Sequence, residues 1–308
     1  MHGDGSRPSP VSRLSRRSVV GQLAAAGAAL TALVADPATR SANARGLDAR
    51  GLTSAGTRKG TLMSQSTPNA AAPLTVVLVH GAFADASSWN GVVERLMAAG
   101  VQVTAPANPL RGIANDSAYI TSYLNQIPGP VLAVGHSYGG AIITNAATNA
   151  KNDIGLVYVA AFAPDEGEVL GEVEKGSKDS VLNTALLSLN YPTGQGSETA
   201  QEFLINPELF HDVFTGDLSQ EEAALFAATQ RPASAFAFSE PNGVPAWKTL
   251  PSWAVVATGD KAAGADVVRS MAERAGADIT EVEGSHVIMI SQPQAVTDVI
   301  MKAIDALV

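Results

Sequence analysis

The sequence predicts an α/β protein in which a mostly parallel sheet of about six strands carries helices on both faces. From Leu74 onwards, short apolar runs rich in β-branched residues alternate with amphipathic stretches, as in chains that cross between parallel strands. The 308 residues are 46% hydrophobic and 16% charged, which suits a well-filled core. The alternation stops between about residues 165 and 250, where helix starts appear instead. We expect that segment to form a helical lid.

Six short apolar runs are the candidate strands of this sheet. In order they are Leu74–Val79, Val101–Ala105, Val131–Val134, Ile154–Val159, Trp253–Ala257 and Ile279–Glu283. In a parallel sheet the segments that follow the strands meet at one edge, where ligands bind in open α/β folds. Residues that directly follow these runs are therefore the first candidates for a functional site.

Helical spacing is clearest near the two ends of the expected domain. Apolar side chains recur at i, i+3, i+4 and i+7 from Trp89, and Gly100 is expected to end that helix. Another single apolar stripe runs along residues 296–307. Ser291 and Gln294 have the spacing of a capping box and are expected to begin this last helix.

Two helix starts can be recognised in the expected lid. Asn206 and Pro207 offer a cap and a first-turn proline ahead of an apolar stretch. Ser219 and Glu222 again have the spacing of a capping box. No strand-like run is evident in this segment, so we expect the lid to be built from helices.

Residues 1–44 resemble a twin-arginine export signal. Two arginines at 16–17 precede a modestly apolar run, and residues 42–44 form a small-x-small cleavage pattern. The apolar run is interrupted and shorter than the ~20 predominantly apolar residues of a bilayer span. The protein is therefore expected to be exported, to the periplasm or the medium, without a stable membrane anchor.

Composition and charge indicate a leader segment and exclude several classes of partner and site. Residues 45–73, rich in Gly, Ser, Thr and Ala without a sustained period, are expected to form a flexible leader to a domain at 74–308. The net charge of −9 offers no basic field, so no nucleic acid partner is expected, and the oligomeric state stays open. The absence of cysteine excludes disulfides, thiolate metal sites and cysteine nucleophiles. No metal or other cofactor is expected.

The third apolar run leads directly into a candidate nucleophile. Val131–Val134 continues into Gly135, Ser137 and Gly139 in a Gly-x-Ser-x-Gly pattern, and a helical run of small residues follows. Glycines on both sides allow a sharp turn that holds the serine in a strained conformation without collisions. The pattern alone is weak, but its place between a strand and a helix predicts that Ser137 is a nucleophile.

A second turn is expected at the same edge of the sheet. The first strand ends in His80, Gly81 and Ala82. Acyl transfer requires hydrogen-bond donors directed at a developing oxyanion. The backbone N–H groups of Ala82 and Tyr138 are the candidates, because one follows the His-Gly turn and the other follows the serine.

A general base can be found among five histidines. His2 falls in the expected signal, and His80 and His136 lie in turns where structural hydrogen bonds are the more natural role. His211 lies in the expected lid, where it is expected to be satisfied locally or solvated. His286 follows the last strand at the functional edge and is the expected general base.

A carboxylate is needed to orient that histidine. Asp260 follows the strand Trp253–Ala257 on the adjacent loop, which gives the chain order Ser, Asp, His. Asp165, after the strand Ile154–Val159, is the alternative. Asp260 is therefore the expected orienting acid. For either residue, the competing interpretation is a solvated loop aspartate with no catalytic role.

Residues 74–308 resemble the compact lidded α/β hydrolases that include plant methyl esterases, hydroxynitrile lyases and related bacterial esterases. The resemblance rests on four motifs: Val77–Ala82, Gly135–Gly139, Gly259–Asp260 and Gly284–His286. It implies the α/β-hydrolase fold with a serine triad. Val287 stands where plant hydroxynitrile lyases have lysine, which disfavours cyanohydrin cleavage.

Together these features predict a serine hydrolase that cleaves a carboxylic ester of a small to medium apolar substrate through an acyl-enzyme. Phe83, Phe210 and Phe214 are candidate substrate contacts, although most apolar lid residues are expected to form lid core. Two alternatives stay open. The same triad can serve a lyase or peroxidative reaction, or the fold can act as a ligand-binding protein without catalysis.

Overall fold

A computed structural model describes residues 72–308. The expected export signal, 1–44, and nearly all of the expected leader, 45–73, lie outside the described residues. Within 72–308, none of the helices is long and apolar enough to cross a membrane.

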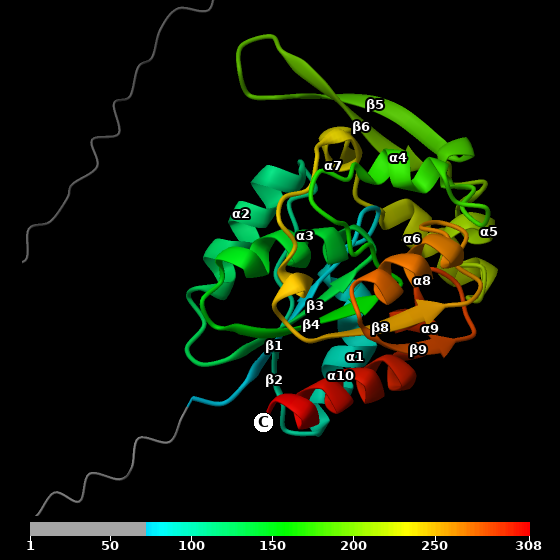
Figure 1. Ribbon diagram of the computed structural model, residues 1–308. Coiled ribbons are helices and arrows are strands. Elements are labelled where there is room, and N and C mark those ends of the chain that lie inside the picture. Colours follow the sequence, from blue (N-terminus) through cyan, green and yellow to red (C-terminus); the bar gives the residue numbers. More distant parts are fainter. Residues whose placement is uncertain (1–71) are drawn as a thin grey trace, which may run out of the picture. The chain divides into compact units, whose positions relative to one another are not determined.

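The predicted sheet is present, with six strands that all run parallel in the order β2-β1-β3-β4-β8-β9 (Figure 1). Its strands are β1 (Thr75–Val79), β2 (Gln102–Thr104), β3 (Val131–His136), β4 (Asp153–Val159), β8 (Ser252–Ala257) and β9 (Asp278–Val282). All six predicted runs are confirmed, with ends that shift by one or two residues. The central strands β1, β3 and β8 are buried along their whole length, which explains why their sequences are nearly continuous apolar runs.

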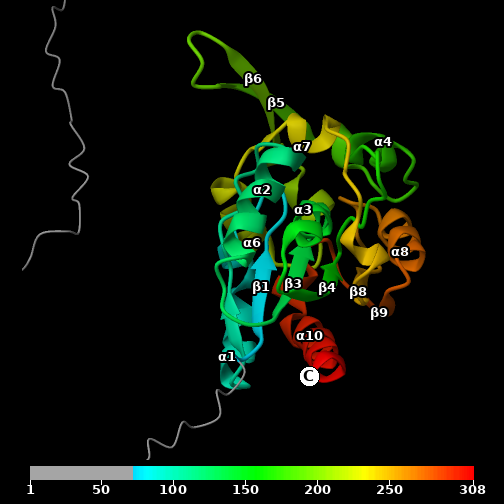
Figure 2. The same ribbon diagram turned by 60° about the vertical axis from the view of Figure 1, so that its left-hand side comes forward.

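Helices cover the sheet on both faces (Figures 1 and 2). Helices α1 (Asn90–Ala98) and α10 (Pro293–Leu307) pack against each other, and α2 (Ile113–Leu124) packs against α3 (Tyr138–Ala146) on the other face, where α8 (Ala265–Arg274) also lies. Gly100 ends α1 as predicted, with φ of +77°. Residues 72–308 also contain four short 3-10 helices: Ala86–Trp89, Ala147–Asn149, Leu182–Thr184 and Ala246–Lys248.

The start of α10 differs from the prediction. Ser291 ends the preceding short helix α9 (Ile288–Ser291), so it cannot cap the next one. Gln292 occupies the N-cap position without a side-chain cap bond, and the side chain of Gln294 donates to Asp298 instead. Pro293, with its fixed φ, provides the helix start.

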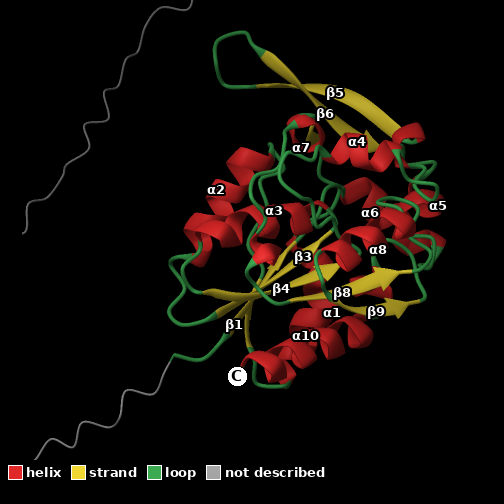
Figure 3. Ribbon diagram, in the orientation of Figure 1, coloured by secondary structure: helices red, strands yellow, loops and turns green. Residues whose placement is uncertain are grey.

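The lid between β4 and β8 contains strands as well as helices, so the expectation of a purely helical lid is wrong. Its helices are α4 (Leu170–Lys175), α5 (Phe210–Phe214), α6 (Gln220–Thr229) and α7 (Phe236–Ser239), and its antiparallel sheet is β5 (Leu186–Pro192), β6 (Thr199–Ile205) and β7 (Ala233–Ser234). The β5–β6 hairpin projects from the body of the domain (Figure 3). Most of β5 is exposed, yet Leu187, Leu189 and Tyr191 alternate with polar residues along it, so the strand does have a period-2 pattern in the sequence.

The two predicted helix starts in the lid have different outcomes. Ser219 caps α6 with the complete capping box, in which Glu222 returns a bond to the Ser219 backbone. Asn206 does not cap a helix, because its side chain closes a turn by accepting from the N–H of Glu208. Helix α5 starts later, with Leu209 as its N-cap.

Candidate active site

Ser137 lies in the sharp turn between β3 and α3. Its φ of +53° and ψ of −124° are strained for a residue with a side chain. A Cβ on Gly135 would lie 2.5 Å from the carbonyl oxygen of Gly139, and one on Gly139 would collide with the carbonyl oxygen of Val79. The two glycines are therefore sterically required, as the Gly-x-Ser-x-Gly pattern predicts.

Asp260 and His286 form a buried pair at the same edge of the sheet. His286 Nδ1 lies 2.8 Å from Asp260 Oδ2, and the two side chains are only 1% and 0% exposed. Asp260 Oδ1 accepts from the N–H groups of Ala262 and Ala263 at 2.9 and 3.0 Å. With the carboxylate held as an acceptor on both oxygens, Nδ1 donates, and Nε2 of neutral His286 is free to accept a proton.

The loop of His286 is attached to the residue that precedes the serine. His136 Nε2 donates to the backbone oxygen of His286 at 3.0 Å, and the two imidazole rings are 4.7 Å apart. The loop of the predicted base therefore lies beside the residue that precedes the predicted nucleophile. Within residues 72–308, no hydrogen bond joins the Ser137 hydroxyl directly to the His286 ring.

The turn after β1 lies directly against Ser137. A Cβ on Gly81 would lie 2.6 Å from the Cβ of Ser137, so only glycine permits this approach. His80 locks the turn: its Nε2 accepts from the Asn108 N–H at 2.9 Å, which leaves Nδ1 to donate to the Gly81 carbonyl at 2.9 Å. Burial lowers the pKa of His80 to about 4, so this ring is neutral and structural, as predicted. Ala82 follows in the same buried turn.

Tyr138, the other predicted oxyanion residue, is held by its phenol. Its hydroxyl donates to Asp116 Oδ2 at 2.9 Å, and Asp116 also accepts from the backbone N–H of Arg111. Burial, and then the Asp116 carboxylate, raise the pKa of Tyr138 well above its ordinary value, so the phenol stays protonated. Asp116 thus fixes the start of α3 to α2, a role that its sequence position did not reveal.

The other candidate acids and bases are engaged elsewhere. Burial lowers the pKa of His136 well below its ordinary value, and its proton is used on the His286 carbonyl. In the lid, His211 Nε2 donates to the Leu218 carbonyl at 3.1 Å. The alternative acid Asp165 lies 2.5 Å from Lys248 and is not the partner of His286.

The geometry agrees with the comparison to known families. A family model described as "Alpha/beta hydrolase family" matches residues 76–299. The chain belongs to the alpha/beta hydrolase family. Among curated proteins it is similar to a "Carbendazim hydrolyzing esterase" of Nocardioides sp. (strain SG-4G), with 31% identity over 107 residues. That match covers 30% of this chain and 44% of the relative, so less than half of the relative is spanned.

Solved structures show the same fold. Polyneuridine aldehyde esterase superposes with a TM-score of 0.65 at 23% identity, covering 76% of this chain and 100% of that one. Tomato methylketone synthase I, in complex with 2-tridecanone, gives a TM-score of 0.62 at 21% identity, covering 77% and 100%. At these identities the likeness concerns the fold alone.

The lid also braces the loop of the predicted base. Asp217, between α5 and α6, accepts from the Ser285 N–H at 2.9 Å and from the Ser285 hydroxyl in a very short hydrogen bond. Burial alone would raise the pKa of Asp217, but these hydrogen bonds hold it below its ordinary value. This brace could not be predicted from the sequence, because its two partners are 68 residues apart.

The three predicted substrate contacts form one aromatic cluster, and Phe214 joins it to His286. The ring centroid of Phe214 lies 5.0 Å from that of His286, 5.1 Å from Phe210 and 6.2 Å from Phe83. All three phenylalanines line a cavity of about 20 Å³ with Phe226, Val287 and Ile290. The three aromatic rings are almost fully buried, whereas Ser87 and Thr229, which also line the cavity, are exposed.

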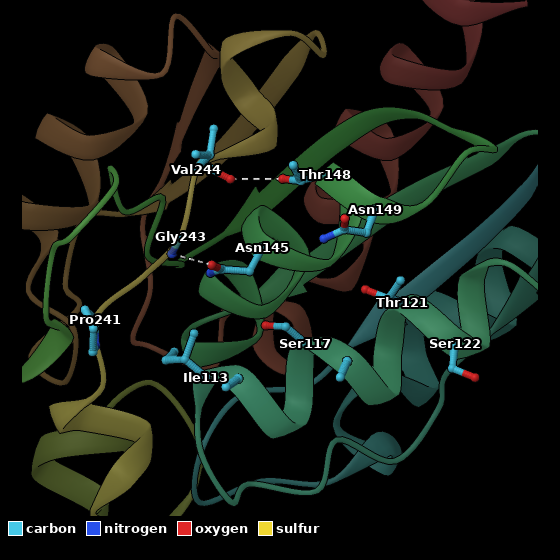
Figure 4. A pocket seen from close by; sticks show the side chains of 12 residues that line it. Ile113, Ser117, Thr121, Ser122, Asn145, Thr148, Asn149, Pro241, Gly243 and Val244 are labelled. Atoms are coloured by element: carbon cyan, nitrogen blue, oxygen red, sulfur yellow. Dashed lines mark hydrogen bonds between the residues drawn. The ribbon is translucent and has the colours of Figure 1, made fainter.

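A larger hollow than this cavity lies away from the predicted site. A groove of about 750 Å³ runs between α2, α3 and the segment from Pro241 to Val244 (Figure 4). Its polar groups largely bond to one another: Thr148 donates to the Val244 carbonyl, and Asn145 accepts from the Gly243 N–H. No predicted site residue lines it, so its size is no indication of the reaction site.

Among residues 72–308, no cluster of three or more His, Asp or Glu side chains is arranged to hold a metal ion. The carboxylate of Asp260, in particular, is already engaged by two N–H groups and the imidazole.

Proposed function

We propose that the protein hydrolyses carboxylic esters through an acyl-enzyme, with Ser137 as nucleophile, His286 as general base and Asp260 as the orienting acid. The observation that carries the proposal is the fully buried Asp260–His286 hydrogen bond, at the edge of the sheet that presents the strained serine. A neutral imidazole oriented in this way accepts a hydroxyl proton near neutral pH.

In the proposed reaction, Ser137 attacks the ester carbonyl while His286 Nε2 takes the hydroxyl proton. The backbone N–H groups of Ala82 and Tyr138 stabilise the oxyanion, since both residues flank Ser137 in rigid turns. His286 then returns the proton to the leaving alcohol. Water activated by the same imidazole releases the acid and regenerates Ser137.

The proposed substrate is an ester with a small to medium apolar portion. Phe214 packs beside His286, and Phe83 and Phe210 pack against Phe214, so apolar surface lies next to the proposed base. The esterase names of the curated relative and of a structural neighbour favour this reaction class over a lyase.

The test is covalent labelling together with turnover. The protein should react with a fluorophosphonate probe and hydrolyse short-chain aryl esters, and Ser137→Ala should lose both activities. Labelling without ester turnover would contradict the proposal and favour a lyase or a binding protein. Turnover that survives in Ser137→Ala would exclude the triad.

We also propose export through the twin-arginine route, which rests on the arginines at 16–17 and the small-x-small pattern at 42–44. Replacement of both arginines by lysine should retain the full-length precursor inside the cell. Cleaved protein outside the cytoplasm despite this double substitution would refute the route.

A further inference from the structure

A buried carboxyl that the proposed reaction does not use lies near the Asp260–His286 pair. Glu174, in lid helix α4, is only 4% exposed. It takes part in none of the ion pairs formed within the described part of the chain. An ionised carboxylate buried without a cation is costly, so the surroundings of Glu174 favour its neutral form.

The hydrogen bonds of Ser180 point to the same protonation state. The Ser180 hydroxyl lies 2.6 Å from the carbonyl oxygen of Ala262, which can only accept, so the single hydroxyl proton is used there. Ser180 Oγ also lies 3.2 Å from Glu174 Oε1. With its own proton committed, Ser180 can only accept in this second contact, and Glu174 must then supply the proton.

Electrostatics around Glu174 agree with this geometry. Burial raises the pKa of Glu174 to about 7; a hydrogen bond donated by Ser180 to the ionised carboxylate would lower it, but the Ser180 proton is used on the Ala262 carbonyl. Helix α7, which packs on α4, carries no titratable residue. The other charged residues on the neighbouring segments are solvent-accessible: Glu172, Lys175, Lys178, Asp179, Lys261, Asp266 and Arg274.

Through Ser180, the protonated carboxyl reaches the loop of the orienting acid. Ser180 holds the carbonyl of Ala262, and the N–H of Ala262 donates to Asp260 Oδ1 at 2.9 Å. We propose that Glu174 is a positioning residue that must keep its proton for full activity, because its neutral form holds the Asp260 loop through Ser180. This rests on the proposed function. Ionisation of Glu174 removes the donated hydrogen bond and adds a second negative charge near Asp260.

The experiment compares pH profiles of kcat/KM for a short-chain aryl ester between about pH 6 and about pH 9. Glu174→Gln carries an N–H donor at every pH and so mimics the protonated carboxyl. Wild type and Glu174→Gln should match at about pH 6, and wild type should fall about fivefold to tenfold below the variant by about pH 9. Glu174→Ala should be low throughout, and the exposed Glu172→Gln should follow wild type.

Superimposable profiles of wild type and Glu174→Gln would overturn the proposal, as would a folded Glu174→Gln that is inactive at every pH. Thermal unfolding of each variant separates these outcomes from misfolding. If wild type hydrolyses no ester at any pH, the proposed function fails instead. The rate of fluorophosphonate labelling at Ser137, measured over the same pH range, then tests the role of Glu174 independently.

Discussion

Replacing Asp260 by asparagine tests the orientation of His286 directly. Two backbone N–H groups point at Asp260 Oδ1, at 2.9 and 3.0 Å, so the amide oxygen of asparagine must take this position. The amide NH₂ then faces His286 Nδ1, which can only accept from it. The ring proton moves to Nε2, the nitrogen that has to receive the proton of Ser137.

The expected loss is large because the pair is sealed from water. With exposures of 1% and 0%, no solvent can reorient the imidazole or replace the lost charge. We expect kcat/KM for a short-chain aryl ester to fall by about 10³ to 10⁴-fold, equivalent to about 4 to 5.5 kcal/mol of transition-state stabilisation. Thermal unfolding should change little, because both N–H groups keep their acceptor.

Asp165→Asn is the matched control for this substitution. Its carboxylate pairs with the half-exposed Lys248, so kcat/KM should stay within about twofold of wild type. A loss of less than about tenfold in Asp260→Asn, or an equal loss in both variants, would refute the assigned orientation of His286.

Three further substitutions test the scaffold. Gly81→Ala places a Cβ 2.6 Å from that of Ser137. This variant should lower stability by about 1–3 kcal/mol and kcat/KM by about 100-fold. Unchanged kinetics would show that the turn can move aside. The lowered pKa of Asp217 stabilises the fold above its ordinary pKa of 3.8, and this contribution is lost as pH falls through the lowered value. Asp217→Asn should therefore flatten the acid side of a plot of unfolding midpoint against pH, and an unaltered slope would contradict the brace. Ser219→Ala should lower stability by about 1 kcal/mol in chemical denaturation with unchanged kcat/KM, and no loss of stability would mean that the capping box contributes nothing.

Elements buried on both sides could be predicted from the sequence. The strands β1, β3 and β8 are apolar at nearly every position because neither face meets water. The chain then places Ser137, Asp260 and His286 directly after strands of one parallel sheet, so their convergence at one edge follows from topology. The family and the fold expected from these motifs are confirmed.

What the sequence did not reveal depends on contacts between distant segments. Strand β5 is an exception, because the alternation of Leu187, Leu189 and Tyr191 with polar residues is a strand pattern that the expectation of a purely helical lid disregarded. Ser291 was misjudged because a short helix ends there. Asp116 and Asp217 reach their partners through the folded arrangement of lid and core, which leaves no pattern along the chain. The spacing of apolar residues along the chain indicates which positions are buried, but it does not indicate which polar side chains bond across loops.

The projecting β5–β6 hairpin is also a convenient place for genetic fusion. Gly194 and Gly196 both have positive φ, and a Cβ added at either would meet nothing within 4 Å. Exposed loop tips of this kind tolerate inserted peptides, because no buried contact has to be broken. An affinity tag or a small reporter domain placed between these glycines would leave the chemistry of the sheet edge undisturbed.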